Sequence, residues 1–73
     1  MIKMHLSKLL GEKRMTQTRL AQLAGVRPST VNVFYHETIK RIDVDMLDAI
    51  CRVLQCQPGD LLEYVEDDSG TLE

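Results

Sequence analysis

The chain has 73 residues and a mass of 8.3 kDa, which is enough for one small domain. Its hydrophobic fraction of 44% and charged fraction of 27% are typical of a globular domain and exclude a disordered one. So short a chain has little room for an enclosed catalytic pocket, and we therefore expect no enzyme. No apolar run approaches the roughly 18 residues of a membrane span. Two cysteines, Cys51 and Cys56, cannot build a disulfide framework, so we expect a cytoplasmic protein without a membrane segment.

The charges are divided unevenly along the chain, although the net charge is only −2. Residues 1–41 carry eight basic and two acidic side chains, whereas residues 42–73 carry one basic and nine acidic ones. This asymmetry predicts a basic face for an anionic partner and an acidic face turned elsewhere. The alternative is a solvated surface whose asymmetry has no function.

The first part of the chain predicts two helices. Apolar residues fall on one helix face over residues 4–13, with Ile2 one turn earlier. Thr16 can cap a second helix that begins at Gln17. This helix stops at Gly25, because glycine fits the left-handed position that ends many helices.

Two further helices follow, separated by a loop. Pro28 suits the first turn of a helix over residues 28–35. The β-branched residues of that segment would also suit a strand, but the spacing of its apolar residues favours a helix. Residues 36–42 predict a loop, after which Asp43 can cap a fourth helix over residues 44–55.

A fifth short helix is predicted from Pro58 to about Tyr64. This helix is too short to bury all the apolar residues among 61–65 in the core of the domain. We therefore expect some of them to contact a second copy of the chain. The acidic residues that follow have the composition of a flexible tail. We therefore expect one domain over residues 1–65 and an acidic tail over residues 66–73. The predicted fold class is all-α, a compact bundle of five short helices.

The second and third helices carry the most information about function. They flank the turn Gly25-Val26-Arg27, which is too short to let them run side by side, so they must cross steeply as in a helix-turn-helix unit. Ala21 supplies the small side chain that such a crossing needs, and Val26 can anchor the turn in the core.

Residues 16–26, Thr-Gln-Thr-Arg-Leu-Ala-Gln-Leu-Ala-Gly-Val, closely resemble the motif of the Cro and phage-repressor regulators, the XRE-like helix-turn-helix family. Residues 40–43, 47–51 and 57–62 resemble the fourth and fifth helices of that family, so the resemblance covers about residues 4–65. It implies a lambda-repressor-like DNA-binding domain whose second motif helix enters the major groove. The implied function is sequence-specific regulation of transcription, as a repressor that binds double-stranded DNA as a homodimer on a two-fold symmetric operator. No cofactor is implied.

A helical projection of the third helix separates an inner face from an outer one. Val31 and Phe34 lie on the inner face, whereas Ser29, Asn32 and Val33 project outward. Asn32 can form two hydrogen bonds with adenine, Ser29 can donate or accept one, and Val33 can contact a thymine methyl group. The alternative is a solvated polar face without a partner.

The resemblance also implies contacts with the DNA backbone. The glutamine that begins the first motif helix, here Gln17, reaches a phosphate in this family, and the amides at that helix end add an anion site. Lys40 and Arg41 match the loop that follows the backbone, where contacts add salt-sensitive affinity rather than sequence choice. The full set of residues expected at the DNA is Gln17, Thr18, Arg27, Pro28, Ser29, Thr30, Asn32, Val33, His36, Lys40 and Arg41.

The sequence departs from the family pattern in two places. Leu10 and Tyr35 stand where many members pair an arginine with a glutamate, and losing both charges together can be neutral. The loop His36-Glu37-Thr38 lacks the glycine that often occurs there, so a left-handed turn would be strained. Glu37 also brings a negative charge near the expected phosphates.

A protein-interaction module, such as an antitoxin-like partner, is the alternative function, and it would use the acidic residues 60–68. A metal centre is not expected, because Cys51, Cys56, His5 and His36 are too scattered for zinc. We expect the two cysteines to be buried as small apolar residues instead.

Overall fold

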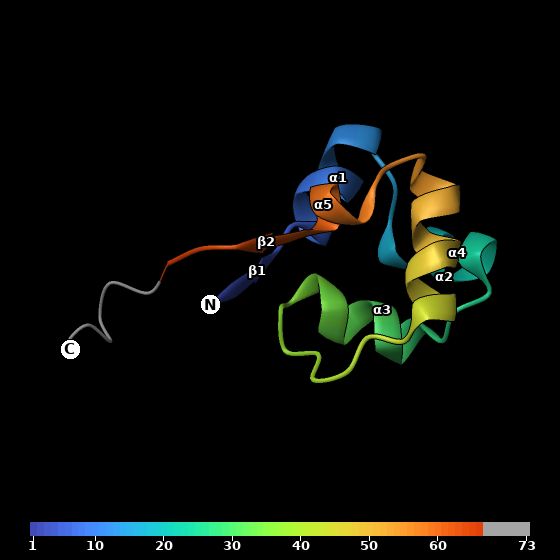
Figure 1. The fold of residues 1–73 in the computed structure, drawn as a ribbon. Coiled ribbons are helices and arrows are strands. Elements are labelled where there is room, and N and C mark those ends of the chain that lie inside the picture. Colours follow the sequence, from blue (N-terminus) through green and yellow to red (C-terminus); the bar gives the residue numbers. More distant parts are fainter. Residues whose placement is uncertain (67–73) are drawn as a thin grey trace.

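The computed structural model describes residues 1–66 and contains five helices and one two-stranded ribbon in that part of the chain (Figure 1). The predicted fold class, a compact bundle of five short helices, is confirmed, and the ribbon is an addition to it. Most of the predicted acidic tail, residues 67–73, lies outside the described residues. The elements are β1 (Ile2–Met4), α1 (Leu6–Lys13), α2 (Gln17–Ala24), α3 (Pro28–Tyr35), α4 (Val44–Leu54), α5 (Pro58–Leu61) and β2 (Leu62–Tyr64).

Side-chain caps fix the starts of α2 and α4 where the sequence predicted them. The Thr16 hydroxyl accepts a hydrogen bond of 3.0 Å from the amide of Arg19. The Asp43 carboxylate accepts one of 2.7 Å from the amide of Met46. Each cap satisfies one of the amides that have no acceptor inside the helix, which typically stabilises a helix by about 1 kcal/mol.

Three helices end in the same way, in what we call the six-residue closure. The residue after the helix adopts a left-handed conformation, and the next amide donates back to the carbonyl five positions earlier. The left-handed residues are Arg14 after α1 (φ 54°), Gly25 after α2 (φ 69°) and Gln55 after α4 (φ 54°). The closing bonds run from Met15 to Leu10 (2.9 Å), from Val26 to Ala21 (3.1 Å) and from Cys56 to Cys51 (3.1 Å).

The ribbon corrects two helix predictions. The first helix begins at Leu6, and the last ends at Leu61 after a single turn, because the residues outside them pair as antiparallel strands. The register places Ile2 opposite Tyr64 and Met4 opposite Leu62. Since alternate residues of a strand share one face, these four side chains lie on the same side of the ribbon.

The core is built from aliphatic residues and one phenylalanine. Ala21 is only 4% exposed and lies on α2, the helix that packs against both α3 and α4. Leu10 is buried and Tyr35 is half-buried against the core, so the family's ion pair is replaced here by apolar packing. Within residues 1–66, no buried polar side-chain atom lacks a hydrogen-bond partner. None of the helices described is long and apolar enough to cross a bilayer.

Candidate nucleic-acid interface

The third helix presents a polar outer side, as the helical projection predicted. Val31 and Phe34 are completely buried, whereas Ser29 and Asn32 are exposed. Val33 is half-exposed. Because a helix in the major groove contacts bases with its exposed side, Ser29 and Asn32 occupy positions suited to base contacts.

The start of α3 is bordered by the helix-turn-helix turn. Arg27 precedes the helix as its N-cap, and Pro28 occupies the first turn; both are exposed. Thr30 is half-buried and lines a hollow of about 520 Å³ that it shares with Asp43 and Asp45 at the start of α4.

Two of the predicted DNA-contacting residues are hydrogen-bonded to each other. The Asn32 side-chain amide donates to the side-chain oxygen of Gln17, with 3.2 Å between Nδ2 and Oε1. The bond joins the outer side of α3 to the first residue of α2. No sequence pattern indicates this bond, because it depends on how the two helices cross.

The beginning of α2 is electrostatically suited to a phosphate. The first turn of α2 contains no acidic residue, and Thr18 is exposed there. The first amides of a helix point away from it without an acceptor in the helix, and the helix dipole adds partial positive charge. An anion can therefore bind beside Gln17 and Thr18.

The loop after α3 is held in place by the end of that helix. The Val33 carbonyl accepts hydrogen bonds from the amides of Thr38 (2.8 Å) and Ile39 (3.1 Å). Lys40 and Arg41 follow and are exposed, as is His36 directly after α3. These basic side chains border α3 on its C-terminal side.

Glu37 adopts the left-handed conformation that the sequence predicted to be strained, with φ 61°. Its carboxylate accepts a hydrogen bond of 3.2 Å from the amide of Met4 in β1. The negative charge expected near the DNA is therefore bound to the ribbon. No feature of the sequence indicated this contact, because it joins segments 33 positions apart.

No group of three potential metal-ligating residues lies together within residues 1–66. Cys51 and Cys56 are free thiols and half-buried, so the prediction that they are buried is only partly correct.

The described part of the chain offers the outer side of α3, the N-terminus of α2 and the basic loop after α3 as its candidate interface.

A model of the Cro/C1-type HTH DNA-binding domain matches residues 5–67, nearly the whole chain. The chain belongs to this family. It is 35% identical over 60 residues to an uncharacterised HTH-type transcriptional regulator of Bacillus subtilis, YozG, covering 82% of this chain and 71% of that protein. Its fold is similar to that of the transcriptional regulator VanUg, with a TM-score of 0.72 and 28% identity, covering 90% of this chain and 87% of the other.

As a member of the Cro/C1-type family, the chain is a DNA-binding regulator of transcription whose partner is double-stranded DNA. The likeness to VanUg extends over most of both chains, so it includes the elements on both sides of the helix-turn-helix unit.

Proposed function

We propose that this protein represses transcription in the cytoplasm by inserting α3 into the major groove of a specific DNA site. The observation that carries this proposal is the exposed pair Ser29 and Asn32 on the outer side of a helix whose inner side, at Val31 and Phe34, is fully buried. A DNA-binding domain of this kind can repress transcription by occupying the DNA that the transcription machinery needs.

The proposal divides the expected DNA-contacting residues into two groups. Ser29, Asn32 and Val33 contact base edges, with Arg27 at the helix start within reach of a guanine or a phosphate. The phosphate contacts come from the start of α2, from the loop after α3 and from side chains beside the base-contacting side of α3. This second group contains Gln17, Thr18, Thr30, His36, Lys40 and Arg41, whereas Pro28 lies with Arg27 at the helix start that faces the base edges.

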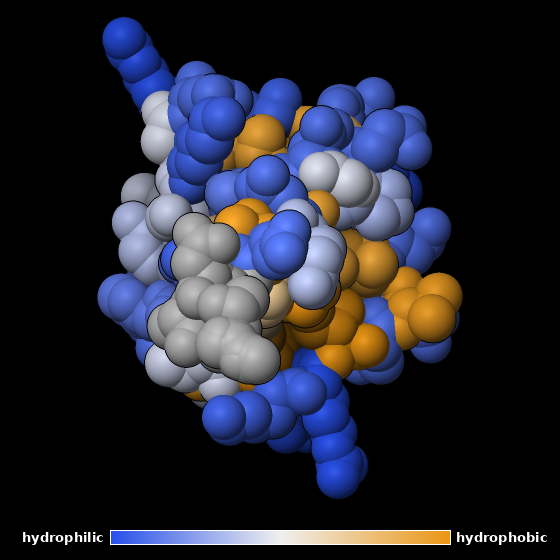
Figure 2. Space-filling model, turned by 60° about the vertical axis from the view of Figure 1, so that its left-hand side comes forward, coloured by the Kyte–Doolittle hydropathy of each residue, from blue (hydrophilic) through white to orange (hydrophobic). Residues whose placement is uncertain are grey.

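A homodimer is the working form in this proposal, because one recognition helix spans only a few base pairs. The ribbon supplies a contact surface: Ile2 and Tyr64 face each other across the two strands and are 54% and 72% exposed. Figure 2 turns this side of the molecule forward and shows apolar surface exposed among charged side chains. Pairing two copies there would bury these side chains together.

Selection of bound duplexes from a random DNA pool tests the function. We expect enrichment of one sequence with two inverted half-sites whose centres lie about one helical turn apart. Enrichment of a single, asymmetric half-site would refute the dimer, and the absence of any enriched sequence would refute base reading by α3.

Sedimentation on DNA tests the dimer contact. Tyr64→Asp should bind as a monomer or lose the cooperative complex, because a charge enters the apolar contact. Val44→Asp is the matched control, since Val44 is an exposed hydrophobic residue, 80% exposed, but lies on α4. Normal pairing by Tyr64→Asp would place the contact elsewhere.

A further inference from the structure

The end of α4 brings two thiols together through backbone geometry. Cys51 and Cys56 are the first and last residues of the six-residue closure after α4, and the Cys56 amide donates to the Cys51 carbonyl over 3.1 Å. In this closure the first and last side chains contact each other, usually as an apolar pair. At the ends of α1 and α2 the same positions hold Leu10 with Met15 and Ala21 with Val26. Only the closure of α4, among the described helices, places two sulfur atoms there.

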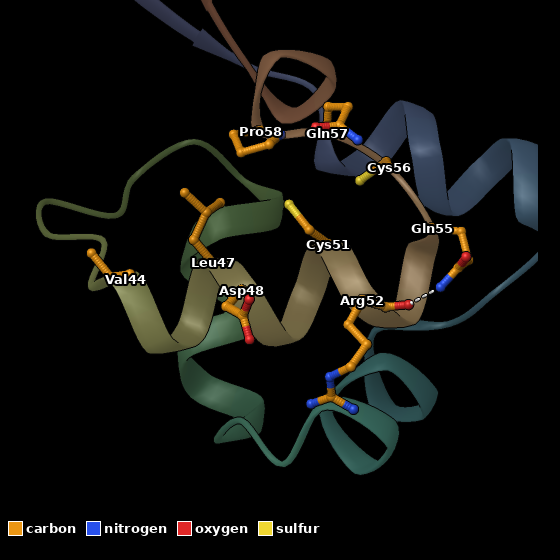
Figure 3. A pocket seen from close by; sticks show the side chains of 9 residues that line it. All are labelled: Val44, Leu47, Asp48, Cys51, Arg52, Gln55, Cys56, Gln57 and Pro58. Atoms are coloured by element: carbon orange, nitrogen blue, oxygen red, sulfur yellow. Dashed lines mark hydrogen bonds between the residues drawn. The ribbon is translucent and has the colours of Figure 1, made fainter.

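The two side chains lie on the wall of a groove of about 540 Å³. Figure 3 shows them there, with the Cys56 sulfur turned toward that of Cys51. Both residues are free and half-buried, so a small reagent can reach them through the groove while the backbone keeps them adjacent.

We propose that Cys51 and Cys56 form a site of reversible oxidation, at which an organic hydroperoxide converts the two thiols into an intramolecular disulfide. In the first step one sulfur, as its thiolate, attacks the terminal peroxide oxygen. An S–O bond forms, the O–O bond breaks, and the released alkoxide takes up the thiol proton to leave as an alcohol. In the second step the other sulfur attacks the sulfenic sulfur, the S–S bond forms, and water leaves with the second thiol proton. The two thiols supply the two electrons that reduce the peroxide, and a small thiol reverses the reaction by exchange.

The pKa of Cys56 determines how its attack on the peroxide depends on pH. Burial and the neighbouring Cys51 thiol raise the pKa of Cys56 to about 11, so it is protonated at neutral pH. Because the thiolate is the attacking species, its rate of attack should increase about tenfold for each pH unit between neutrality and that pKa. Attack by Cys56 is therefore slow at neutral pH.

The disulfide should leave the DNA-binding side unchanged. The first turn of α4 lies beside the start of α3, where Asp43, Arg27 and Thr30 line one hollow. The thiols lie at the opposite end of α4, beside Gln57 and Pro58 (Figure 3). Closing a ring of six residues there constrains the connection to α5 without requiring α3 to move.

The experiment treats the reduced protein with cumene hydroperoxide at several pH values and follows its intact mass. We expect a monomer lighter by two hydrogen atoms, with one linked peptide joining Cys51 to Cys56, restored by dithiothreitol. In a glutathione buffer the ratio of disulfide to dithiol should be at least about tenfold higher for the folded chain than for the chain in guanidinium.

Cys51→Ser and Cys56→Ser are the matched controls, each checked for folding by thermal unfolding. Each should lose the intramolecular product and accumulate sulfenic acid or a mixed disulfide instead. A wild-type protein that forms only intermolecular or mixed disulfides would overturn the proposal. So would equal disulfide ratios in the folded and unfolded chains. Unchanged DNA binding after oxidation supports the assigned location, whereas lost binding would show that the bond moves α3.

Discussion

Asn32 on α3 donates its side-chain amide to the oxygen of Gln17 on α2, over 3.2 Å. The bond uses one amide hydrogen of Asn32 and leaves its carbonyl oxygen and its other amide hydrogen for a base. It also holds Gln17 beside the helix start, where a phosphate can bind. Asn32, which we propose contacts a base, and Gln17, which we propose contacts a DNA phosphate, therefore orient each other before DNA binds.

Asn32→Ala should weaken binding to the preferred duplex by about 1–3 kcal/mol, because two hydrogen bonds to adenine are lost. The loss should be concentrated at one base pair. Titration of preferred and scrambled duplexes measures it, with the scrambled duplex expected to change little. Equal losses on both duplexes would contradict the assignment of Asn32 to base reading.

The bond between Gln17 and Asn32 predicts that their contributions to DNA binding are not additive. We expect a double-mutant cycle built from Gln17→Ala, Asn32→Ala and the double variant to give a coupling energy of about 0.5–3 kcal/mol, as for other side chains in contact. Affinities on the preferred duplex give this value directly. Ser29 is exposed on the same helix without a described bond to Gln17, so a cycle of Gln17→Ala with Ser29→Ala is the control. A coupling no larger than in the control would mean that the bond does not persist on DNA.

Lys40→Ala and Arg41→Ala should each weaken binding to every sequence alike. Each lost phosphate contact should reduce the slope of log affinity against log salt by about 1. Binding curves at several salt concentrations measure this slope. Arg52→Ala is the control, since Arg52 is the one basic residue in the acidic half of the chain and lies in the last turn of α4. A salt slope that changes as much in the control as in the loop variants would argue against loop contacts.

Two substitutions at Glu37 separate backbone strain from the hydrogen bond to Met4. Glu37→Ala loses the bond and keeps the left-handed conformation, so it should destabilise the domain by about 0.5–1.5 kcal/mol. Glu37→Gly loses the same bond but relieves a conformation that costs other residues about 1–2 kcal/mol, so it should be more stable than Glu37→Ala. Urea unfolding measures both.

The same position also tests an electrostatic effect on DNA. Glu37→Gln keeps an acceptor for the Met4 amide and removes the charge, so affinity should increase modestly and mainly at low salt. An unchanged affinity at low salt would show that the carboxylate on the ribbon is too far from the phosphates to repel them.

Ala21→Leu should destabilise the domain by about 1–3 kcal/mol, because Ala21 is 4% exposed between α2 and its neighbours. Thermal unfolding and DNA titration should both reveal the loss. Ala24→Leu provides a comparison one turn later on the same helix, where the exposed fraction is 9%. Unchanged stability in Ala21→Leu would contradict close packing at the crossing.

The sequence predicted the features that depend on neighbouring residues. Thr16 and Asp43 cap their helices as expected, since a cap needs only an oxygen three residues before an amide. Gly25 ends α2 as predicted, but Arg14 and Gln55 adopt the same left-handed conformation without glycine. Their closures are stabilised by the contacts that follow, which no local propensity reveals.

The ribbon and the details of the interface depend on residues far apart in the chain. Ile2 lies four residues before Leu6 and so fits one face of a helix, but Ile2 and Met4 also fit one side of a strand, and three residues are too few to distinguish the two periods. Only the presence of Leu62 and Tyr64 opposite them decides for the strand. The outer position of Asn32 followed from the projection, whereas its bond to Gln17 required the actual crossing of α2 and α3.

The pairing of β1 with β2 also determines the order in which the molecule assembles. The Met1 carbonyl accepts a hydrogen bond of 2.8 Å from the Val65 amide, joining residues 64 positions apart, whereas the helix ends close over six residues. Bringing such distant segments together costs more chain entropy than closing a turn, so we expect the ribbon to form after the helices have packed. Its contacts are then largely absent from the folding transition state, and loosening them accelerates unfolding while leaving the folding rate nearly unchanged. We therefore expect substitutions that loosen the ribbon to shorten the lifetime of the folded domain, on the side of the molecule that we propose a second copy covers.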